Sequence, residues 1–339
     1  MTDHFFVLPE NRNLPSGGNR YNHFLIRALI RLGVAVESGG LSQALQRMKG
    51  NTRMSVWVDS LYLSRLQVVL ESAASKQPIY LIVHHLPSFE PDLDREEIAM
   101  EIAREKESFS GVAGFLVTST YVKQRLEARG LKGKKFIIVP PALCLKPSQR
   151  PVEPKRFTGL MVSNLIARKG ILEFLESLER VTKPKDEFVV NIAGRHDIEP
   201  CYADACFQSA ADSSSLKKHI RFLGAVTMKG LEKLYSSSSV FISASKMETF
   251  GMAIQEALAF GLPVFAYDGG YAKAHIVERI NGYLCSTFLE LAEKCVEFIR
   301  DPEKLKSLRE NSEKPSMDYG YTWDDAAAAF IRQISYAQA

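Results

Sequence analysis

Short runs of apolar residues, each followed by a segment of helical character, recur along this chain. The runs at 115–117, 136–139 and 264–266 contain no polar residue. A continuous apolar run is typical of a strand that is buried on both faces, whereas a half-exposed strand alternates apolar and polar residues. Alternation of such strands with helices is typical of parallel sheets covered by helices on both faces. We therefore expect an α/β fold built from doubly wound domains.

The chain is long enough for two such domains. Its 339 residues exceed what one hydrophobic core usually fills, and a hydrophobic content of 46% is sufficient for two cores. Prolines and polar residues interrupt every periodic pattern between 140 and 154. We predict a first domain at 1–145, a linker at 146–155 and a second domain at 156–317. A closing helix at 318–336 follows, with Thr322 or Asp318 as its N-cap.

The segment 243–264 carries the clearest functional pattern. An apolar strand at 240–243 precedes it, and a helix is expected to open near 249–251 and to end at 261–263. The first N–H groups of a helix are unpaired, and the helix dipole there favours anions. Four residues at this helix start are therefore candidates to hold a diphosphate: Phe250, Gly251, Met252 and Ala253.

Two glutamates flank this helix start. Glu248 and Glu256 lie eight residues apart, which is a rise of about 12 Å along a helix. A nucleotide sugar spans a similar length from its sugar ring across the diphosphate to the ribose, so one carboxylate could hold each end. The ordinary alternative is that a strand followed by an amphipathic helix is common α/β architecture and that surface glutamates are frequent.

The residues around this motif closely resemble the nucleotide-sugar half of the family-4 retaining glycosyltransferases, which have the GT-B fold. The resemblance rests on Glu-Thr-Phe-Gly at 248–251, Glu-Ala-Leu-Ala-Phe-Gly-Leu-Pro-Val at 256–264, Asp-Gly-Gly at 268–270 and Asn-Gly-Tyr-Leu at 281–284. It extends back through 220–227, Gly194 and 162–170, and so covers nearly the whole second half. It implies two Rossmann-like doubly wound domains facing a deep cleft, with the closing helix completing the first domain.

The resemblance also implies roles for individual residues. Glu248 would bind hydroxyls of the transferred sugar, and Glu256 the ribose. Family members carry an arginine five residues before the lysine that neutralises the donor diphosphate. Here Lys169 keeps the lysine, Asn164 stands at the arginine position, and Arg168 is a substitute because guanidinium grips phosphate bidentately. The alternative is that Arg168 and Lys169 only decorate a helix start.

Further donor-side candidates come from the loops that follow neighbouring strands. The loops after Gly194 and after Gly224 are expected to meet the base, and Val226 lies in the second of them. In the first half, Ser16-Gly-Gly-Asn lies between a strand at 4–8 and a helix at 21–33. Gly17 and Gly18 resemble the family's glycine loop facing the donor phosphates, and Asn19 is an acceptor-side candidate. Taken alone, paired glycines more often form a simple turn.

An apolar strand at 78–83 delivers two adjacent histidines into a loop. Family members carry a histidine there near the reacting sugar. His84 is the closer match, His85 is the alternative, and a structural histidine is the ordinary interpretation. Glu90 is a further acceptor-side candidate. No spacing of Cys, His or Asp resembles a zinc site, so we expect neither a metal nor another cofactor.

Charge and hydropathy limit the remaining partners. A net charge of +4 does not indicate a nucleic-acid partner, while the basic run at 129–135 is either a solvated loop or a contact with anionic lipid. The chain has no stretch of eighteen apolar residues and no apolar signal core. Five cysteines without paired spacing fit reduced thiols. We expect a cytoplasmic protein that could touch a membrane surface peripherally.

These observations predict a retaining glycosyltransferase that moves a sugar from a nucleoside diphosphate sugar to an acceptor hydroxyl. A UDP-sugar is the first choice of donor, and the acceptor could be a saccharide, a lipid or a small molecule. Two alternatives stay open, a GT-B nucleotide-sugar epimerase and a non-catalytic GT-B binding protein. The sequence does not identify the base, the sugar, the acceptor or the oligomeric state.

Overall fold

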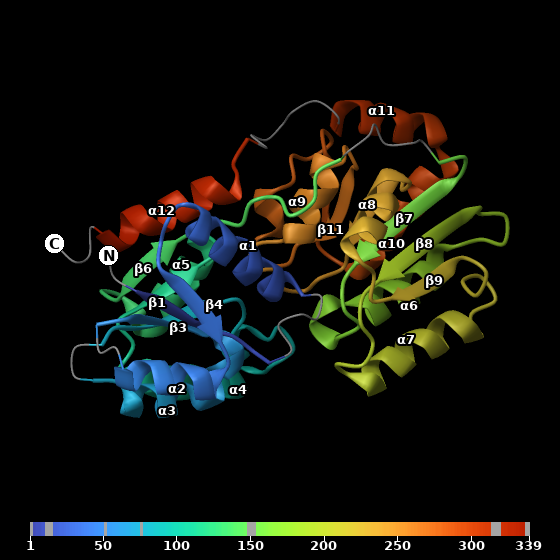
Figure 1. Ribbon diagram of the computed structural model, residues 1–339. Helices are drawn as coiled ribbons and strands as arrows, with labels where there is room; N and C mark the ends of the chain where they lie inside the picture. The colour runs from blue at the N-terminus through green and yellow to red at the C-terminus, as the bar shows by residue number, and fades with distance from the viewer. Residues whose placement is uncertain are drawn as a thin grey trace. The chain divides into compact units, whose positions relative to one another are not determined.

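The computed structural model describes residues 3–10, 16–50, 53–74, 77–147, 154–312 and 320–335. The chain forms two compact units (Figure 1), unit 1 from Met1–Ala142 with Tyr321–Ala339 and unit 2 from Leu143–Gly320. These divisions lie close to the expected boundaries at 145 and 318. Within the expected linker, residues 148–153 lie outside the described part of the chain, as do 318, 319 and 336 of the expected closing helix.

Unit 1 is built on a parallel sheet of six strands in the order β2-β1-β3-β4-β5-β6. The strands are β1 (His4–Val7), β2 (Val36–Gly39), β3 (Ser55–Asp59), β4 (Ile79–Val83), β5 (Gly114–Val117) and β6 (Lys135–Ile138). The helices are α1 (Gly17–Arg31), α2 (Leu41–Gly50), α3 (Leu66–Ser72), α4 (Arg95–Ser108), α5 (Thr120–Leu126) and α12 (Trp323–Ser335), with the short helices η1 (Ser60–Arg65), η2 (Pro87–Phe89) and η3 (Glu127–Leu131). The strand order reverses between β1 and β3, where doubly wound sheets bind ligands at the carboxyl ends of their strands.

A row of large side chains crosses one face of this sheet. In register, Phe6 pairs with Trp57, Trp57 with Tyr80, and Tyr80 with Gly114. The Trp57 and Tyr80 rings stack with centroids 4.3 Å apart. A Cβ at Gly114 would lie 2.8 Å from Lys135 O, so the absence of a side chain there lets the Lys135 amine reach 5.4 Å from the Tyr80 ring centroid. The row gives unit 1 a continuous aromatic core.

The closing helix α12 packs on this core and on α1 (Figure 1). Phe330 lies over Trp57, with ring centroids 4.7 Å apart. Gln333 accepts a hydrogen bond from Ile138 N at 2.9 Å and donates one to Ile138 O at 2.8 Å. Its amide therefore occupies the open edge of β6 as a neighbouring strand would.

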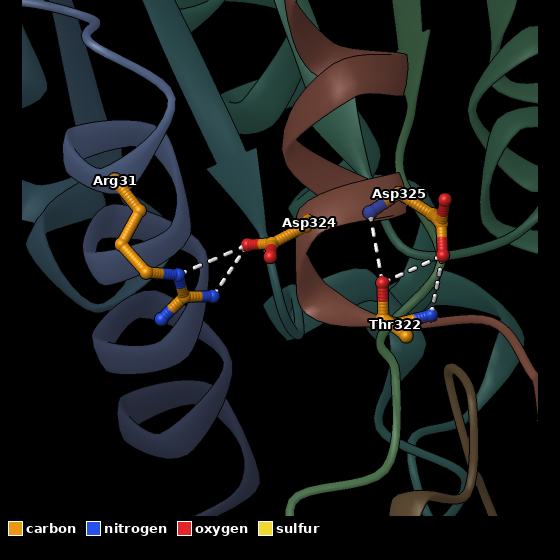
Figure 2. A network of polar contacts seen from close by, with 4 residues as sticks. All are labelled: Arg31, Thr322, Asp324 and Asp325. Carbon is orange, nitrogen blue, oxygen red and sulfur yellow. Dashed lines mark hydrogen bonds and ion pairs between the residues drawn. The ribbon is translucent and has the colours of Figure 1, made fainter.

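The start of α12 is fixed by a cap and an ion pair (Figure 2). Thr322 accepts from Asp325 N at 3.2 Å, and Asp325 accepts from Thr322 N at 2.8 Å, which is a reciprocal capping arrangement. Of the two N-cap candidates, Thr322 therefore fills the position, and Asp318 lies outside the described residues. Arg31 of α1 binds Asp324 of α12 through Nε at 3.1 Å and through a second guanidinium nitrogen.

Unit 2 is also a parallel six-stranded sheet, in the order β12-β11-β10-β7-β8-β9. The strands are β7 (Phe157–Val162), β8 (Phe188–Ala193), β9 (Ile220–Gly224), β10 (Val240–Ser243), β11 (Val264–Tyr267) and β12 (Gly282–Cys285). The helices are α6 (Ile171–Val181), α7 (Pro200–Asp212), α8 (Met228–Ser236), α9 (Met252–Ala259), α10 (Phe288–Arg300) and α11 (Pro302–Ser312), with η4 (Ala167–Lys169) and η5 (Ala272–Ala274).

The core of unit 2 lies on both faces of its sheet. Side chains of α6, α7 and α10 cover one face, and those of α8 and α9 cover the other. Such two-sided burial is what the continuous apolar runs indicate. The strand order reverses between β7 and β10, and this switch point is where a doubly wound sheet binds its ligand.

No helix in the described part of the chain is both long enough and apolar enough to cross a membrane.

We expect Gln333→Met to destabilise unit 1. Methionine keeps the length of the side chain but leaves the Ile138 N–H and C=O without their partner, which typically costs about 1–3 kcal/mol. Both tryptophans of the chain, Trp57 and Trp323, belong to unit 1. Urea unfolding followed by tryptophan fluorescence therefore measures the stability of this unit.

The matched control is Gln67→Met. Gln67 donates to Glu71 on the exposed surface of α3, and exposed pairs contribute little. An unchanged midpoint in Gln333→Met, equal to that of the control, would show that the β6 edge does not need the amide of α12.

Candidate functional site

The loop between β10 and α9 holds Glu248 through its backbone. Glu248 N donates to Gly269 O at 3.2 Å, and Tyr271 N donates to Glu248 O at 2.8 Å. Gly270 has φ +67°, and a Cβ there would overlap Glu248 O, while a Cβ at Gly269 would overlap Ser245 O. The Gly-Gly pair is therefore required for the two loops to lie against each other.

The carboxylate of Glu248 forms an ion pair with Lys169. Lys169 Nζ lies 2.5 Å from Glu248 Oε1, and the two side chains are 17% and 18% exposed. Burial alone would raise the pKa of Glu248, but the charge and hydrogen bond of Lys169, the charge of Arg168 and a hydrogen bond from Ser245 together lower it below the ordinary value. Glu248 is therefore a carboxylate, and the pair presents one cation and one anion side by side.

This pair lines a hollow at the carboxyl ends of β7 and β10. The hollow collects residues from both strand ends and from the first turn of α9: Met161, Val162, Ser163, Lys169, Phe241, Ile242, Ser243, Ala244, Ser245, Glu248, Gly251, Ala253 and Ile254. It lies at the switch point of the sheet. The sequence-predicted residues Lys169, Glu248, Gly251 and Ala253 meet here, although Lys169 and Glu248 are 79 residues apart in the chain.

Arg168 and Lys169 come to this edge through a tight turn. They belong to η4, and Gly170 follows with φ +63°, where a Cβ would overlap Ala244 O. Lys246 N donates to Arg168 O at 2.9 Å, so the backbone of the loop after β7 is joined to the loop after β10. The Lys246 side chain binds Glu173 Oε1 of α6 at 2.6 Å, which fixes the same junction from outside.

The helix start at Gly251 is shaped for close approach by a ligand. Gly251 has φ +94° and no side chain caps the first turn of α9. Phe250 is buried and Met252 is half-buried. The unpaired N–H groups and the dipole at such a start favour an anion.

Two residues outside the predicted site, His275 and Asn281, hold this turn. His275 is 4% exposed and donates from Nε2 to Phe250 O at 2.6 Å. Burial lowers the pKa of His275, although the bond to Phe250 and the charge of Glu248 oppose it, so the ring is neutral near pH 7. Asn281 donates to His275 O at 3.0 Å. Asn281 lies in the Asn-Gly-Tyr-Leu motif, whereas nothing in the sequence pattern points to His275.

Glu256 lies away from this hollow. Its side chain is 1% exposed on the inner face of α9, and Tyr235 OH donates to Oε2 at 3.2 Å. Glu248 precedes α9, which begins at Met252, and the rotation of the helix turns the carboxylate of Glu256 into the packing against α8. The role of Glu256 in binding a ribose stays a prediction.

The other donor-side candidates connect neighbouring loops. Asn164 Oδ1 accepts from Arg195 N at 3.0 Å, which joins the loops after β7 and β8. Gly194 lies so close to Ser163 O that a Cβ would overlap it. Val226 packs beside Gly230 at the start of α8. Asn164 thus uses its amide within the protein.

In unit 1 the expected glycine loop is the first turn of a helix. α1 begins at Gly17 rather than at 21, because Ser16 caps it by accepting from Asn19 N at 3.1 Å. Asn19 is buried. Gly18 packs against the His84 imidazole, and a Cβ there would lie 2.9 Å from His84 Cδ2. The structure therefore brings Gly18 and His84 together.

The two histidines after β4 have different partners. His84 is mostly buried, and its Nε2 lies 3.1 Å from Asn22 Oδ1 and 3.4 Å from Asp59 Oδ2. His85 Nε2 lies 2.7 Å from Glu90 Oε1, and both of these side chains are part-exposed. The sequence named His85 and Glu90 as separate candidates and did not foresee their contact, and it missed Asn22 and Asp59.

Across the described ranges, no group of three or more His, Cys, Asp or Glu side chains is arranged to hold a metal ion. The expectation that no metal or other cofactor takes part stays a prediction.

The part of the chain that contains this hollow matches a known protein family. Residues 146–315 match the family described as "Glycosyl transferases group 1". A probable sucrose-phosphate synthase of Thermosipho melanesiensis is 26% identical over 257 residues, which cover 71% of this chain and 58% of that protein. The chain spans about half of the length of the curated relatives it matches, from 49% to 58% for three of them.

Solved structures match the chain over its whole length. Sucrose-phosphate synthase from Thermosynechococcus elongatus has a TM-score of 0.76 at 16% identity, over 100% of this chain and 99% of that chain. Anabaena HepE in complex with UDP-glucose has a TM-score of 0.74 at 15% identity, over 100% of both chains. At such identities the likeness shows the fold alone. The expectation of an α/β GT-B protein with two Rossmann-like doubly wound domains is confirmed.

We expect the contribution of Glu248 to stability to depend on pH. Because its pKa is lowered on folding, the unfolded chain binds the proton more readily, and the ionised carboxylate stabilises the fold above the ordinary pKa of 4.5. That stability is lost as pH falls through the lower value of the folded state. The difference in Tm between the wild type and Glu248→Gln should be largest near neutral pH and shrink below about pH 4.5.

Thermal unfolding at a series of pH values from about 7 to about 3 measures this difference. Glu303→Gln changes an exposed glutamate of α11 in the same unit, and its Tm should follow the wild type at every pH. A Tm difference between the wild type and Glu248→Gln that stays constant over the series would contradict the assignment of an ionised Glu248.

Proposed function

The chain belongs to the glycosyl transferases group 1 family, and on that premise we propose that it transfers a sugar from a nucleoside diphosphate sugar to an acceptor hydroxyl. The family match spans half of the chain and includes the whole hollow at β7 and β10. Glycosyltransferase activity is the coarse part of the proposal. The donor, the stereochemistry and the residue roles are its finer parts.

The observation that carries the proposal is the position of Lys169. Its ammonium lies in the same hollow as the uncapped start of α9, with Arg168 beside it in the chain. A diphosphate in this hollow would meet the Lys169 ammonium and backbone N–H groups, and the charge of Arg168, which acts on Glu248, would add to the attraction. Positive charge at this position stabilises the negative charge that develops on the departing diphosphate. Such electrostatic stabilisation is commonly the largest contribution to the rate enhancement, and it requires no metal.

Glu248 supplies the other half of the site. As a carboxylate it accepts hydrogen bonds but donates none, so it suits hydroxyl groups of a sugar. Hydrogen bonds to a charged group contribute about 1.5–3 kcal/mol each. Since Lys169 binds Glu248 in the structure, Lys169 would share its three N–H donors between the carboxylate and the phosphate when the donor binds.

We infer that the donor is a UDP-sugar. The support is the HepE structure, which has the same fold and holds UDP-glucose. We also infer that the sugar keeps its anomeric configuration. The support is the resemblance to retaining enzymes, together with the engagement of Glu248 by Lys169, which suits a binding role better than that of a nucleophile. Front-face attack is then the expected course.

We expect UDP to raise the thermal stability of the wild type and to have no effect on Lys169→Met. A ligand that binds only the folded state at about 100 times its Kd adds about 2.7 kcal/mol. Thermal unfolding with UDP, GDP, ADP and TDP, each alone and as a common sugar conjugate, measures the effect. Lys304→Met removes another paired lysine of unit 2 and should respond as the wild type does. If none of the nucleotides raises the Tm of the wild type, the proposed donor site is wrong.

The stereochemistry requires a separate measurement. Incubation with an α-linked UDP-sugar and a panel of saccharide, lipid and small-molecule acceptors should give UDP and an α-linked product, read from its anomeric proton by NMR. A β-linked product would disprove retention. Binding of UDP-sugar without any release of UDP would instead indicate a non-catalytic binding protein.

A further inference from the structure

His84 contacts a buried polar pair, Asp59 and Asn22, that no sequence motif predicts. Asp59 ends β3 and is 0% exposed, and Asn22 lies on the inner face of α1 and is 1% exposed. Asn22 Nδ2 donates to Asp59 Oδ2 at 2.6 Å. Buried polar groups of this kind are costly unless they bond to one another, so their arrangement is closely defined.

The direction of the Asn22 amide follows from Asp59. The carboxylate accepts, so the NH₂ group of Asn22 must face it and the amide oxygen must face the other way. That oxygen lies 3.1 Å from His84 Nε2. The second neighbour of Nε2 is Asp59 Oδ2 at 3.4 Å, which also accepts. Two acceptors around one ring nitrogen require that this nitrogen carry the hydrogen.

Asp59 is ionised in this setting. Burial alone would raise its pKa, but the charge that His84 carries when it is protonated, the hydrogen bond from His84, a hydrogen bond from Leu61 N at 2.9 Å and the bond from Asn22 lower it overall. Asp59 therefore has no hydrogen to offer to His84. The direction of the bond cannot be reversed.

The imidazole is confined from several elements at once. Gly18 at the start of α1 packs on its Cδ2 edge, and the Tyr21 ring lies 5.4 Å away in a T-shaped contact. The backbone N of His84 donates to Ser60 Oγ at 3.2 Å. In the described part of the chain, every hydrogen bond of the ring itself is made by Nε2.

We propose that Asp59 and Asn22 are positioning residues that hold His84 in the tautomer with hydrogen on Nε2, so that Nδ1 offers a lone pair to a hydroxyl group of the substrate. A neutral imidazole with Nε2–H has no hydrogen on Nδ1, and this atom can only accept. The ligand group that fits is a hydroxyl that donates, as sugars and their acceptors carry. This inference rests on the proposed function for its substrate, but the tautomer itself does not depend on it.

The experiment is ¹⁵N NMR of the histidine rings in the full-length protein at about pH 8.5, where an ordinary histidine is neutral. His84→Gln identifies the His84 signals by their loss. In the wild type we expect a protonated, pyrrole-like Nε2 and an unprotonated, pyridine-like Nδ1. The reverse pattern would overturn the proposal with no assay of activity, because the measurement needs no ligand.

Asp59→Asn tests the cause. The amide can no longer fix the direction of the Asn22 bond, so we expect the His84 ring signals to move toward a mixture of tautomers. Asp186→Asn is the matched control. It removes a buried carboxylate that binds Arg300 in unit 2, and it should leave the His84 signals unchanged. Unchanged His84 signals in Asp59→Asn would refute the positioning role.

If Asp59→Asn does not fold, Asn22→Ala replaces it, since that variant removes the oxygen facing Nε2 and keeps the carboxylate. We expect it also to shift the His84 signals, and identity with the wild type would count against the proposal. If the wild type does not bind UDP, the proposed function is wrong, but the measured tautomer of His84 is unaffected. The two failures are therefore distinguishable.

Discussion

The pairing of β7 with β10 is the constraint on which the candidate site depends. These strands are neighbours in the sheet although about 80 residues separate them in the chain. Because parallel strands end at the same edge, the loops that follow them must meet. One loop carries Lys169 and the other Glu248, and the backbone bond from Lys246 N to Arg168 O joins the two. The charges meet because the strands do.

At this edge of the sheet, the protein itself supplies no side-chain cap for the start of α9. Gly251 at this start is in the left-handed region, and the Lys169 and Glu248 pair is only partly screened from water. A fold selected for stability alone would cap the helix and bury or remove the pair. Conflict between local rules and the observed structure is expected at functional positions. The aromatic row and the capped α12 of unit 1 show no such conflict.

The sequence predicted the α/β class and the strands at 4–8, 78–83, 115–117, 136–139, 240–243 and 264–266, because continuous apolar runs leave few other structures open. Resemblance to a family motif identified Lys169 and Glu248 as candidates, and the fold brings their side chains into an ion pair. The sequence could not foresee that Tyr235 would bind Glu256 within the protein, since the rotation of a helix about its axis depends on tertiary packing. Nor did periodicity reveal His275 under Phe250, or Asp59 and Asn22 under His84. Asp59 follows the apolar run Val-Trp-Val, and a carboxylate at the end of a buried strand was the signal available.

The amide of Gln333 at the edge of β6 bears on how the chain matures during synthesis. Domains generally form as units as the chain emerges, beginning from the amino end. Here unit 1 takes its last helix from residues made after all of unit 2. Until then the emerging chain carries an unsealed strand edge and an uncovered Trp57, which is the kind of surface that recruits neighbouring chains. The order of translation therefore leaves unit 1 incomplete until the residues of α12 have been made.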